Sequence, residues 1–261
     1  MKPAQMYSLE GKVAMITGGG GGIGSKLAGA LCEAGAEIAI VDRSGSHLKA
    51  TCSLVEELGK EPLSIAADLT KPDEAKAVVA QTVERLGSLD IIVNAIGGGA
   101  GNVLFEAQEY PMDAWEWIMD LNLTTTLVAT QAAVKAMIAG GKGGKVLNIS
   151  SVRGQLGINA GYSAYVAAKG AIDSLTRQWA TEWAKYGINV NAIAPTFVDT
   201  PQVAMLLDDP DFKAGIVNRV PLGRIGTPED LMGAVVMFCS PGSAFITGQV
   251  LTIDGGLTAT Q

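Results

Sequence analysis

Apolar and polar residues follow one another along this chain with two spacings, one typical of strands and one typical of helices. Apolar runs rich in valine and isoleucine predict strands at Lys12–Thr17, Glu37–Asp42, Pro62–Ala67, Asp90–Asn94, Lys145–Ser150, Asn189–Ala194 and Gln249–Ile253. Amphipathic stretches between them predict helices at Ile23–Ala34, Gly45–Leu58, Pro72–Leu86, Met112–Ile138, Tyr162–Lys185 and Pro228–Cys239. Because strands and helices alternate, we expect an α/β fold: a doubly wound, seven-stranded parallel sheet with helices on both faces.

The pattern is continuous, apart from one irregular segment. No change in composition and no low-complexity linker divides residues 1–261, so we expect one domain. The least regular part runs from Pro195 to Thr227 and contains Pro201, Pro221 and an acidic stretch at Asp208–Asp211. A long connection within a compact domain is often a binding loop or lid. We therefore expect a substrate loop around residues 195–227.

Composition and charge narrow the function classes. Apolar residues make up 48% of the chain, enough for a substantial core, but no apolar run reaches the roughly 20 residues that span a bilayer. Met1–Gly11 has no apolar segment of signal-peptide length, so the expected location is cytoplasmic, without a membrane partner. A net charge of −7 argues against nucleic-acid binding. The cysteines Cys32, Cys52 and Cys239 are far apart and His47 is the single histidine, so we expect neither disulfides nor a metal site.

A glycine-rich turn, Thr17–Gly24, follows the first predicted strand and opens the first predicted helix. Gly18, Gly22 and Gly24, with Ile23, let the backbone turn sharply and approach a pyrophosphate at the helix N-terminus. A flexible turn is the alternative for a glycine pattern alone. The strand–turn–helix context favours a dinucleotide site.

Asp42 ends the second predicted strand, where a carboxylate can accept hydrogen bonds from the adenosine ribose. It would repel a 2′-phosphate, which favours NAD over NADP. Capping the helix after Gly45 is another possible role for Asp42, although Ser44 can serve there too. Arg43 could pair with a 2′-phosphate. Gly21 adds no positive charge to the turn, so NAD stays the expected cofactor.

Tyr165 is followed four residues later by Lys169 within a predicted helix. This spacing places both side chains on one helix face. An ammonium beside a phenol lowers a pKa that is otherwise near 10, so Tyr165 becomes a candidate proton acceptor near neutral pH. Taken alone, such a pair is more often solvated than catalytic, and the glycine turn gives it weight.

With the glycine turn, the segment Tyr165-Val166-Ala167-Ala168-Lys169 makes the chain closely resemble the short-chain dehydrogenase/reductase family, from about Leu9 to Gly256. Further matches are Asp68-Leu69, Asn94–Gly97, Asn122, Ser150–Gly154, Pro195–Thr200 and Asp254–Gly256. The resemblance implies a single-domain Rossmann fold and reversible hydride transfer between NAD(H) and a secondary alcohol or ketone.

The resemblance also implies roles for individual residues. Tyr165 exchanges the proton and Lys169 lowers its pKa and binds the nicotinamide ribose. Ser151 orients the substrate oxygen, and Asn122 holds a relay water. We favour Ser151 over Ser150 because it directly precedes Val152-Arg153-Gly154, as the family's serine does. The alternatives are a cap or turn for Ser151 and a polar residue at a helix kink for Asn122. The expected cofactor-binding residues are Gly18, Gly22, Ile23, Gly24, Asp42, Asp68, Leu69, Asn94, Ala95, Tyr165, Lys169, Pro195, Val198 and Thr200.

The substrate pocket is expected from Gly97–Gly101, Ser151–Gly157 and Phe197–Arg219, with Ser151, Arg153 and Tyr165 on the substrate. An inward Arg153 would favour a carboxylate, sulfonate or phosphate, although a lone arginine is more often solvated. Overall similarity favours a sugar, polyol or sugar acid.

Two other functions stay open. One is an NADPH-dependent 3-oxoacyl-thioester (acyl carrier protein) reductase, against which Asp42 counts. The other is a catalytically silent nucleotide-binding protein, against which the presence of Tyr165 and Lys169 counts.

Four tryptophans lie in two of the predicted helices, Trp115 and Trp117 in one, Trp179 and Trp183 in the other. Core packing is the commoner role for each, but aromatic residues on long helices also suit subunit contacts. Since relatives are commonly dimers or tetramers, we expect a homotetramer.

Overall fold

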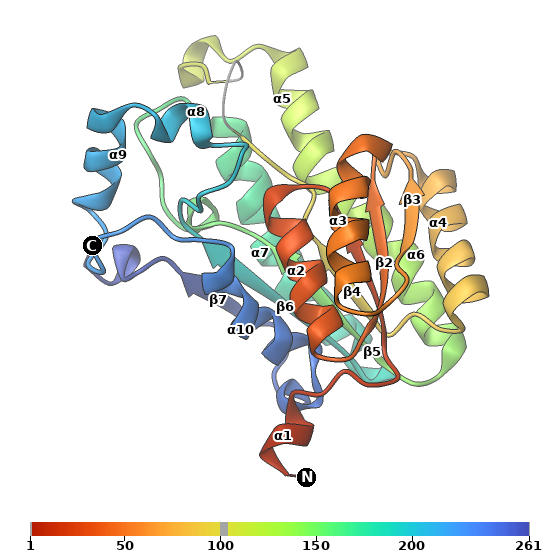
Figure 1. Cartoon of the computed structure of the whole chain (residues 1–261). Helices are drawn as coiled ribbons and strands as arrows, with labels where there is room; N and C mark the ends of the chain where they lie inside the picture. The colour runs from red at the N-terminus through yellow and green to blue at the C-terminus, as the bar shows by residue number, and fades with distance from the viewer. Residues whose placement is uncertain (1, 100–103, 261) are drawn as a thin grey trace.

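The computed structural model describes residues 2–99 and 104–260. It contains a seven-stranded sheet in the order β3-β2-β1-β4-β5-β6-β7, and every neighbouring pair is parallel (Figure 1). The strands are β1 Val13–Thr17, β2 Glu37–Asp42, β3 Leu63–Ala66, β4 Ile91–Asn94, β5 Gly144–Ile149, β6 Ile188–Pro195 and β7 Val250–Ile253. The predicted α/β fold and parallel sheet are confirmed.

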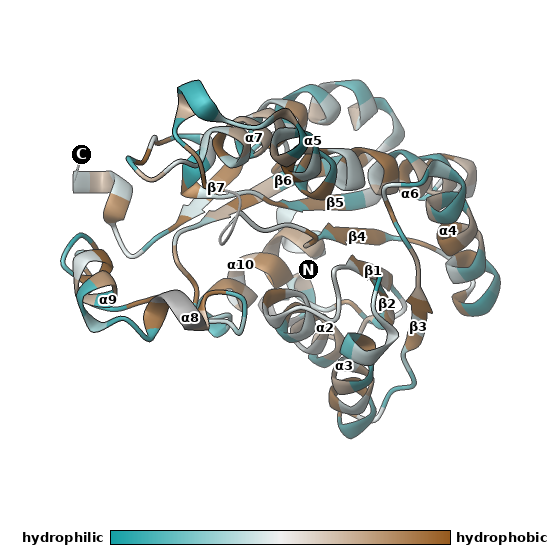
Figure 2. Ribbon diagram, turned by 90° about the horizontal axis from the view of Figure 1, so that it is seen from above, coloured by the Kyte–Doolittle hydropathy of each residue, from teal (hydrophilic) through white to brown (hydrophobic). Residues whose placement is uncertain are grey.

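Helices cover both faces of the sheet. They are α1 Pro3–Met6, α2 Gly22–Glu33, α3 Gly45–Glu57, α4 Pro72–Leu86, α5 Met112–Met119, α6 Thr125–Gly140, α7 Ser163–Trp183, α8 Ala204–Leu207, α9 Pro210–Val217 and α10 Glu229–Cys239. Residues of α2, α3 and α10 pack in one hydrophobic core, and residues of α4, α6 and α7 pack in the other. Seen from above, the sheet lies between these two layers (Figure 2).

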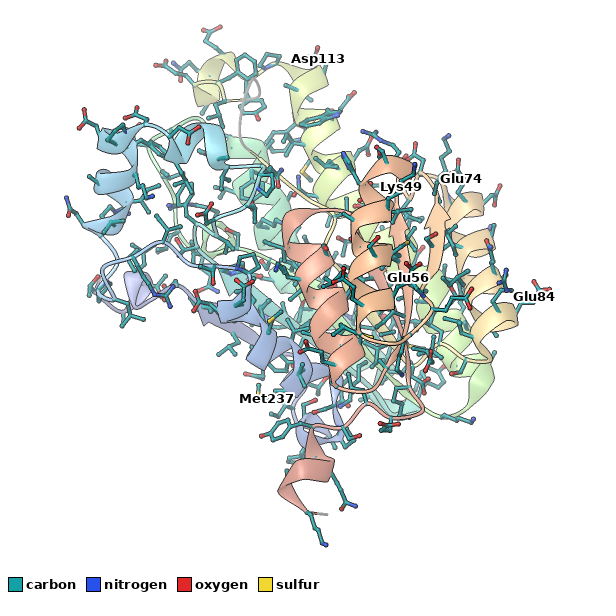
Figure 3. The ribbon with its side chains drawn as sticks, in the orientation of Figure 1. Lys49, Glu56, Glu74, Glu84, Asp113 and Met237 are labelled. Carbon is teal, nitrogen blue, oxygen red and sulfur yellow. The ribbon has the colours of Figure 1, made fainter. Side chains whose placement is uncertain are left out.

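The continuous apolar strands follow from burial on two sides. Along β1, Ala14 and Ile16 point into the core with α2, whereas Met15 between them points into the core with α4. The helices α3 and α4 show the complementary pattern, with charged side chains on the surface that faces away from the sheet. Glu56 of α3 and Glu84 of α4 are examples on the outer surface (Figure 3).

Two stretches differ from the predicted elements. The helix expected at Met112–Ile138 is interrupted, because α5 ends at Met119 and a π-helical turn, Asp120–Thr124, precedes α6. Such a turn adds a residue to the helix, and hydrophobic periodicity does not reveal it. The irregular loop expected after Pro195 contains the short helices α8 and α9 and a bridge between Val198 and Gly226.

The sheet topology also decides where a ligand can sit. β1 lies between β2 and β4, so the connections that follow β1 and β4 leave in opposite directions and open a crevice at the carboxyl edge. Among the described residues, no helix combines the length and apolar character needed to cross a membrane. Over the same residues, no group of three or more His, Cys, Asp and Glu side chains is arranged to hold a metal ion.

Candidate active site

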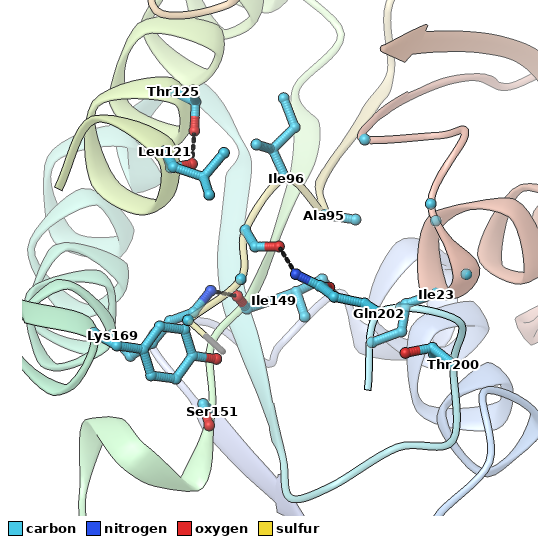
Figure 4. Close-up of a pocket in the computed structure, with 18 of the residues that line it drawn as sticks. Ile23, Ala95, Ile96, Leu121, Thr125, Ile149, Ser151, Lys169, Thr200 and Gln202 are labelled. Atoms are coloured by element: carbon cyan, nitrogen blue, oxygen red, sulfur yellow. Dashed lines mark hydrogen bonds between the residues drawn. The ribbon is translucent and has the colours of Figure 1, made fainter. Parts of the chain in front are cut away.

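A cavity of about 540 Å³ opens at the carboxyl edge of the sheet, and Figure 4 shows it in close-up. Every predicted cofactor-binding residue except Asn94 lines it, and so do Ser151 and Arg153. The structure therefore brings together segments that lie far apart in the sequence. Of the pocket wall expected at 97–101, residues up to Gly99 line the cavity, while residues 100 and 101 lie outside the described part of the chain.

The glycine turn is built for close backbone approach. Gly18 has a φ of +66°, and a Cβ there would lie 2.9 Å from the backbone of Ala95. A Cβ on Gly24 would collide with the carbonyl oxygen of Gly18, and one on Gly22 would lie 2.9 Å from Thr200. No side chain caps the first turn of α2. Its N–H groups face the cavity end that suits a pyrophosphate, so the residues fit a dinucleotide.

At the end of β2, Asp42 is held by the backbone. Its carboxylate accepts hydrogen bonds from Gly20 N at 3.3 Å and Ser44 N at 3.0 Å. His47 Nδ1 lies 3.9 Å from the same carboxylate, and Arg43 also lines the cavity. Nothing in the sequence singled out His47, because it becomes a neighbour of Asp42 only through the turn into α3. The carboxylate of Asp42, the guanidinium of Arg43 and the imidazole of His47 thus lie around the expected adenosine ribose position.

Asn94 lies beneath the cavity rather than in its wall. Its Nδ2 donates to Thr130 Oγ1 at 2.8 Å and to Asn148 Oδ1 at 2.9 Å, and Asn148 in turn donates to Thr176. This buried polar chain ties β4 and β5 to α6 and α7. Asn94 therefore supports the strand ends on which a cofactor would rest.

Tyr165 stands in the cavity wall next to Ser151. A side-chain hydrogen bond with Ser151 lowers the pKa of Tyr165, and so does the nearby charge of Arg153, but burial outweighs both and raises it above the ordinary value. The preceding serine, Ser150, points away, because its hydroxyl donates to Asp173 at 2.5 Å. Of the two serines, Ser151 is the one that contacts the tyrosine.

Lys169 lies one helical turn from Tyr165, as the spacing predicted. Its Nζ donates to the carbonyl of Ile149 at 2.9 Å (Figure 4). The same Nζ lies 5.5 Å from the centre of the Tyr165 ring. Burial lowers the pKa of Lys169 to about 8, opposed by the charge of Asp173. Burial is the dominant influence on the pKa of Tyr165 in this arrangement, and the expectation that Lys169 lowers that pKa stays a prediction.

Asn122 sits in the π-helical turn and is fully buried. Its side chain donates to Ile118 O at 3.0 Å and Gly98 O at 2.9 Å and accepts from Gly98 N at 3.0 Å. It therefore fixes the backbone that follows β4. π-turns recur at functional sites because they re-aim one side chain.

Glycines close the wall around these groups. A Cβ on Gly97 would lie 2.7 Å from Asn122 Oδ1 and 3.0 Å from Lys169 Nζ, and one on Gly99 would collide with the Tyr165 ring. Asn122, Lys169 and Tyr165 thus pack directly against the backbone of Gly97 and Gly99.

Two side chains of the substrate half of the cavity were missed as site residues, Trp117 and Tyr162. Phe197 and Gln202 also line it, and both lie in the stretch Phe197–Arg219 that was expected to form part of the pocket. Trp117 is 50% exposed, so core packing was the wrong expectation for it, whereas Trp179 is buried and stacks on Trp183.

Comparison with known proteins agrees with this geometry. The chain matches the family model described as Enoyl-(Acyl carrier protein) reductase over residues 18–258. It is 40% identical to the 2-dehydro-3-deoxy-D-gluconate 5-dehydrogenase of Escherichia coli (strain K12) over 255 residues, which cover 97% of this chain and 98% of that protein.

Solved structures show the same similarity over the whole fold. A gluconate 5-dehydrogenase from Burkholderia cenocepacia J2315, in complex with NADP and tartrate, superposes with a TM-score of 0.92 at 34% identity and covers 99% of each chain. A putative 2-deoxy-D-gluconate 3-dehydrogenase from Agrobacterium tumefaciens with bound NADP gives a TM-score of 0.87 at 34% identity, over 97% of this chain and 99% of that one. The chain therefore belongs to the short-chain dehydrogenase/reductase family of NAD(P)-dependent oxidoreductases.

Proposed function

We propose that this chain is a single-domain dehydrogenase that transfers hydride reversibly between NAD(H) and a secondary alcohol or ketone of a sugar acid. The observation that carries the proposal is the position of Tyr165, which meets Ser151 at the cavity wall while Lys169 lies one turn behind it. The glycine cradle at Gly18–Gly24 adds a place for the dinucleotide.

The nicotinamide would supply the hydride acceptor for oxidation and the hydride donor for reduction. Tyr165 would take the hydroxyl proton as phenolate during oxidation and return it during reduction. Ser151 would donate to the substrate oxygen and hold it next to the phenol. Because burial raises the pKa of Tyr165, proton uptake depends on groups that favour the phenolate, and Ser151 and Arg153 are two of them.

Lys169 and Asn122 would act behind the tyrosine. The pKa of Lys169 is about 8, so at lower pH its ammonium holds a positive charge near the phenol. Its Nζ would also bind the nicotinamide ribose. Asn122 would hold a relay water through its backbone, since its side chain is already bonded to Gly98 and Ile118. Asn122, Ser151, Tyr165 and Lys169 form the proposed catalytic set.

NAD is the proposed cofactor, and Asp42 is the reason. Its carboxylate at the end of β2 would accept from the ribose hydroxyls and repel a 2′-phosphate. Arg43 and His47 beside it, and the NADP bound in the two related structures, favour the phosphorylated cofactor instead. Kinetic constants with NAD and NADP, for the wild type and for Asp42→Asn, decide between them. If Asp42 excludes the phosphate, the variant gains activity with NADP relative to NAD.

Sugar acids are the proposed substrates because relatives covering nearly the whole chain are named for them. The tartrate in the Burkholderia structure is itself a hydroxy acid. We also propose a homotetramer. Sedimentation that shows only a 26.9 kDa species would refute it.

Tyr165→Phe tests the proposed function. Turnover of aldonic and ketoaldonic acids, followed at 340 nm with both cofactors, should disappear while NADH binding, followed by its fluorescence, is retained. Turnover of 3-oxoacyl thioesters but not of sugar acids would favour the reductase alternative. No turnover of either class by the wild-type protein, with intact NADH binding, would favour a silent nucleotide-binding protein.

A further inference from the structure

Arg153 places a positive charge in the wall of the substrate half of the cavity. Its side chain is 6% exposed, and its Nη1 donates to Gly157 O at 2.9 Å. No ion pair joins it to a carboxylate among the described residues, and residues 100–103 contain no acidic side chain. A buried charge without a partner is unfavourable unless something else neutralises it.

A second cation, Arg219, adds to this charge. Arg219 lies on the turn after α9, in the loop of residues 195–227, with its side chain exposed. Burial lowers the pKa of Arg153, and the positive charge of Arg219 lowers it further. Tyr162 and Tyr165 face Arg153 as well, but burial raises the pKa of both phenols, so neither supplies a negative charge near neutral pH.

Arg224, in the same loop, is an arginine whose charge is neutralised by a carboxylate of the protein. Its two terminal nitrogens donate to the two oxygens of Asp230 at 2.6 and 2.7 Å, and this pairing raises the pKa of Arg224. Asp230 satisfies Arg224 within the protein. Nothing of the kind is described for Arg153, although Arg153 is far more deeply buried.

We propose that Arg153 binds the carboxylate of the substrate. The proposal rests on the proposed function and adds to it the residue that selects an acid. A guanidinium can donate two hydrogen bonds to one carboxylate, and charge-assisted hydrogen bonds of this kind are strong. The hydrogen bond to Gly157 fixes Arg153 in the cavity wall. Arg219 adds positive charge from the loop of residues 195–227.

This arrangement separates acids from alcohols of the same shape. A carboxylate neutralises the buried charge of Arg153 and lessens its repulsion by Arg219, whereas a hydroxymethyl group does neither. D-Gluconate and D-glucitol form a matched pair, since they differ only in a carboxylate replacing a hydroxymethyl group.

The test measures KM for D-gluconate and for D-glucitol with the wild type, Arg153→Met, Arg219→Met and the double variant. We expect the ratio of the two KM values to shift against gluconate by about 10- to 100-fold for Arg153→Met and by about tenfold for Arg219→Met. The double variant should lose less than the product of the single losses, because both arginines act on one carboxylate. Arg85→Met, on the exposed surface of α4, controls for the change in net charge.

A second measurement keeps this proposal apart from the proposed function. Calorimetry of D-gluconate binding to Tyr165→Phe protein saturated with NAD reads the anion site without turnover. Weaker binding when Arg153→Met is added supports the site even if gluconate is not oxidised. The anion-site proposal would be overturned if gluconate bound equally well with and without Arg153, or if it did not bind at all. It would also be overturned if Arg153→Met raised KM equally for gluconate and glucitol. These outcomes do not depend on which substrate the enzyme turns over.

Discussion

Two lysines lie at the two ends of strand β5, the partly buried Lys145 and the buried Lys169, and burial lowers the pKa of both to about 8. Lys145 lies at the amino end, where its Nζ donates to Asn189 Oδ1 at 2.8 Å and Ser243 Oγ at 3.0 Å. Lys169 reaches the carboxyl end, where its Nζ donates to the last carbonyl of the strand, Ile149. The two lysines have the same pKa but different neighbours.

The neighbours decide which lysine takes part in chemistry. Lys145 interacts with Cys239, whose pKa burial raises to about 12, so this thiol stays neutral near neutral pH and offers Lys145 no charged partner. Lys169 adjoins a phenol, a hydroxyl and an open cavity. A perturbed pKa is therefore a sign of burial at both ends of the strand, and a sign of function only where a reactive partner and space for a ligand accompany it.

The largest expected effect tests this contrast directly. Lys169→Met should lower kcat/KM for sugar-acid oxidation by about 10³-fold, because the phenolate loses its nearby positive charge and the ribose loses a donor. Lys145→Met should leave it within about twofold of wild type. Steady-state rates at 340 nm measure both. Similar losses of kcat/KM in the two variants would contradict the proposed difference between the roles of Lys169 and Lys145.

A second prediction sharpens the comparison within the carboxyl end. Ser151→Ala should lower kcat by about 10²-fold, because the developing charge on the substrate oxygen loses a donor. Ser150→Ala removes the hydrogen bond to Asp173 instead and should lower the free energy of unfolding by about 1–2 kcal/mol with a smaller loss of kcat. Turnover and urea unfolding of both variants distinguish the roles, and a larger kcat loss for Ser150→Ala would reverse them.

The third prediction concerns pH. Oxidation requires the phenolate, so kcat/KM should rise about tenfold per pH unit on its acidic side. Ser151 lowers the pKa of Tyr165, so Ser151→Ala should shift this limb to higher pH in its residual activity. A pH profile of kcat/KM for oxidation measures the shift, and a limb that stays in place would remove Ser151 from the control of the phenol.

The smallest expected effect is on stability and concerns Lys145, at the amino end of strand β5. The folded-state pKa of Lys145 is about 8 and its ordinary value is 10.5, so the unfolded chain binds more protons between these pH values. Stability contributed by this group therefore rises with pH across that window, by on the order of 1–2 kcal/mol after allowance for its partial exposure. Urea unfolding of wild type and Lys145→Met at pH 8 and pH 10 measures it. A constant difference between the two proteins would contradict it.

The strands could be predicted from the sequence because each is buried on both faces of the sheet. Such strands appear as short, nearly continuous apolar runs. The sequence did not predict the π-turn at Asp120–Thr124, since the apolar spacing continues through it. α9 did leave a signal. Asp209 caps it by accepting from Asp211 N and Phe212 N, and Pro210 begins it, so Asp-Pro marked a helix start within a segment read as irregular.

The residues of the site could be predicted from the sequence, but the shifts of their pKa values could not. The spacing placed Tyr165 and Lys169 on one face of a helix, and the structure agrees. The sign of the tyrosine's pKa shift depends on how tightly distant segments enclose the ring, which spacing does not encode. Gln202 reaches the cavity through the path of a long loop, and nothing in the local sequence around it specifies that path.

The bare backbone at Gly97 and Gly99 limits how this enzyme can evolve. Any side chain at Gly97 would press on Asn122 and Lys169, and any at Gly99 would displace Tyr165. We therefore expect substitutions there to disturb the proton-transfer groups before they reshape the pocket. Residues 195–227 are the part of the wall in which we expect changes of substrate to arise, because the proposed catalytic residues lie outside them.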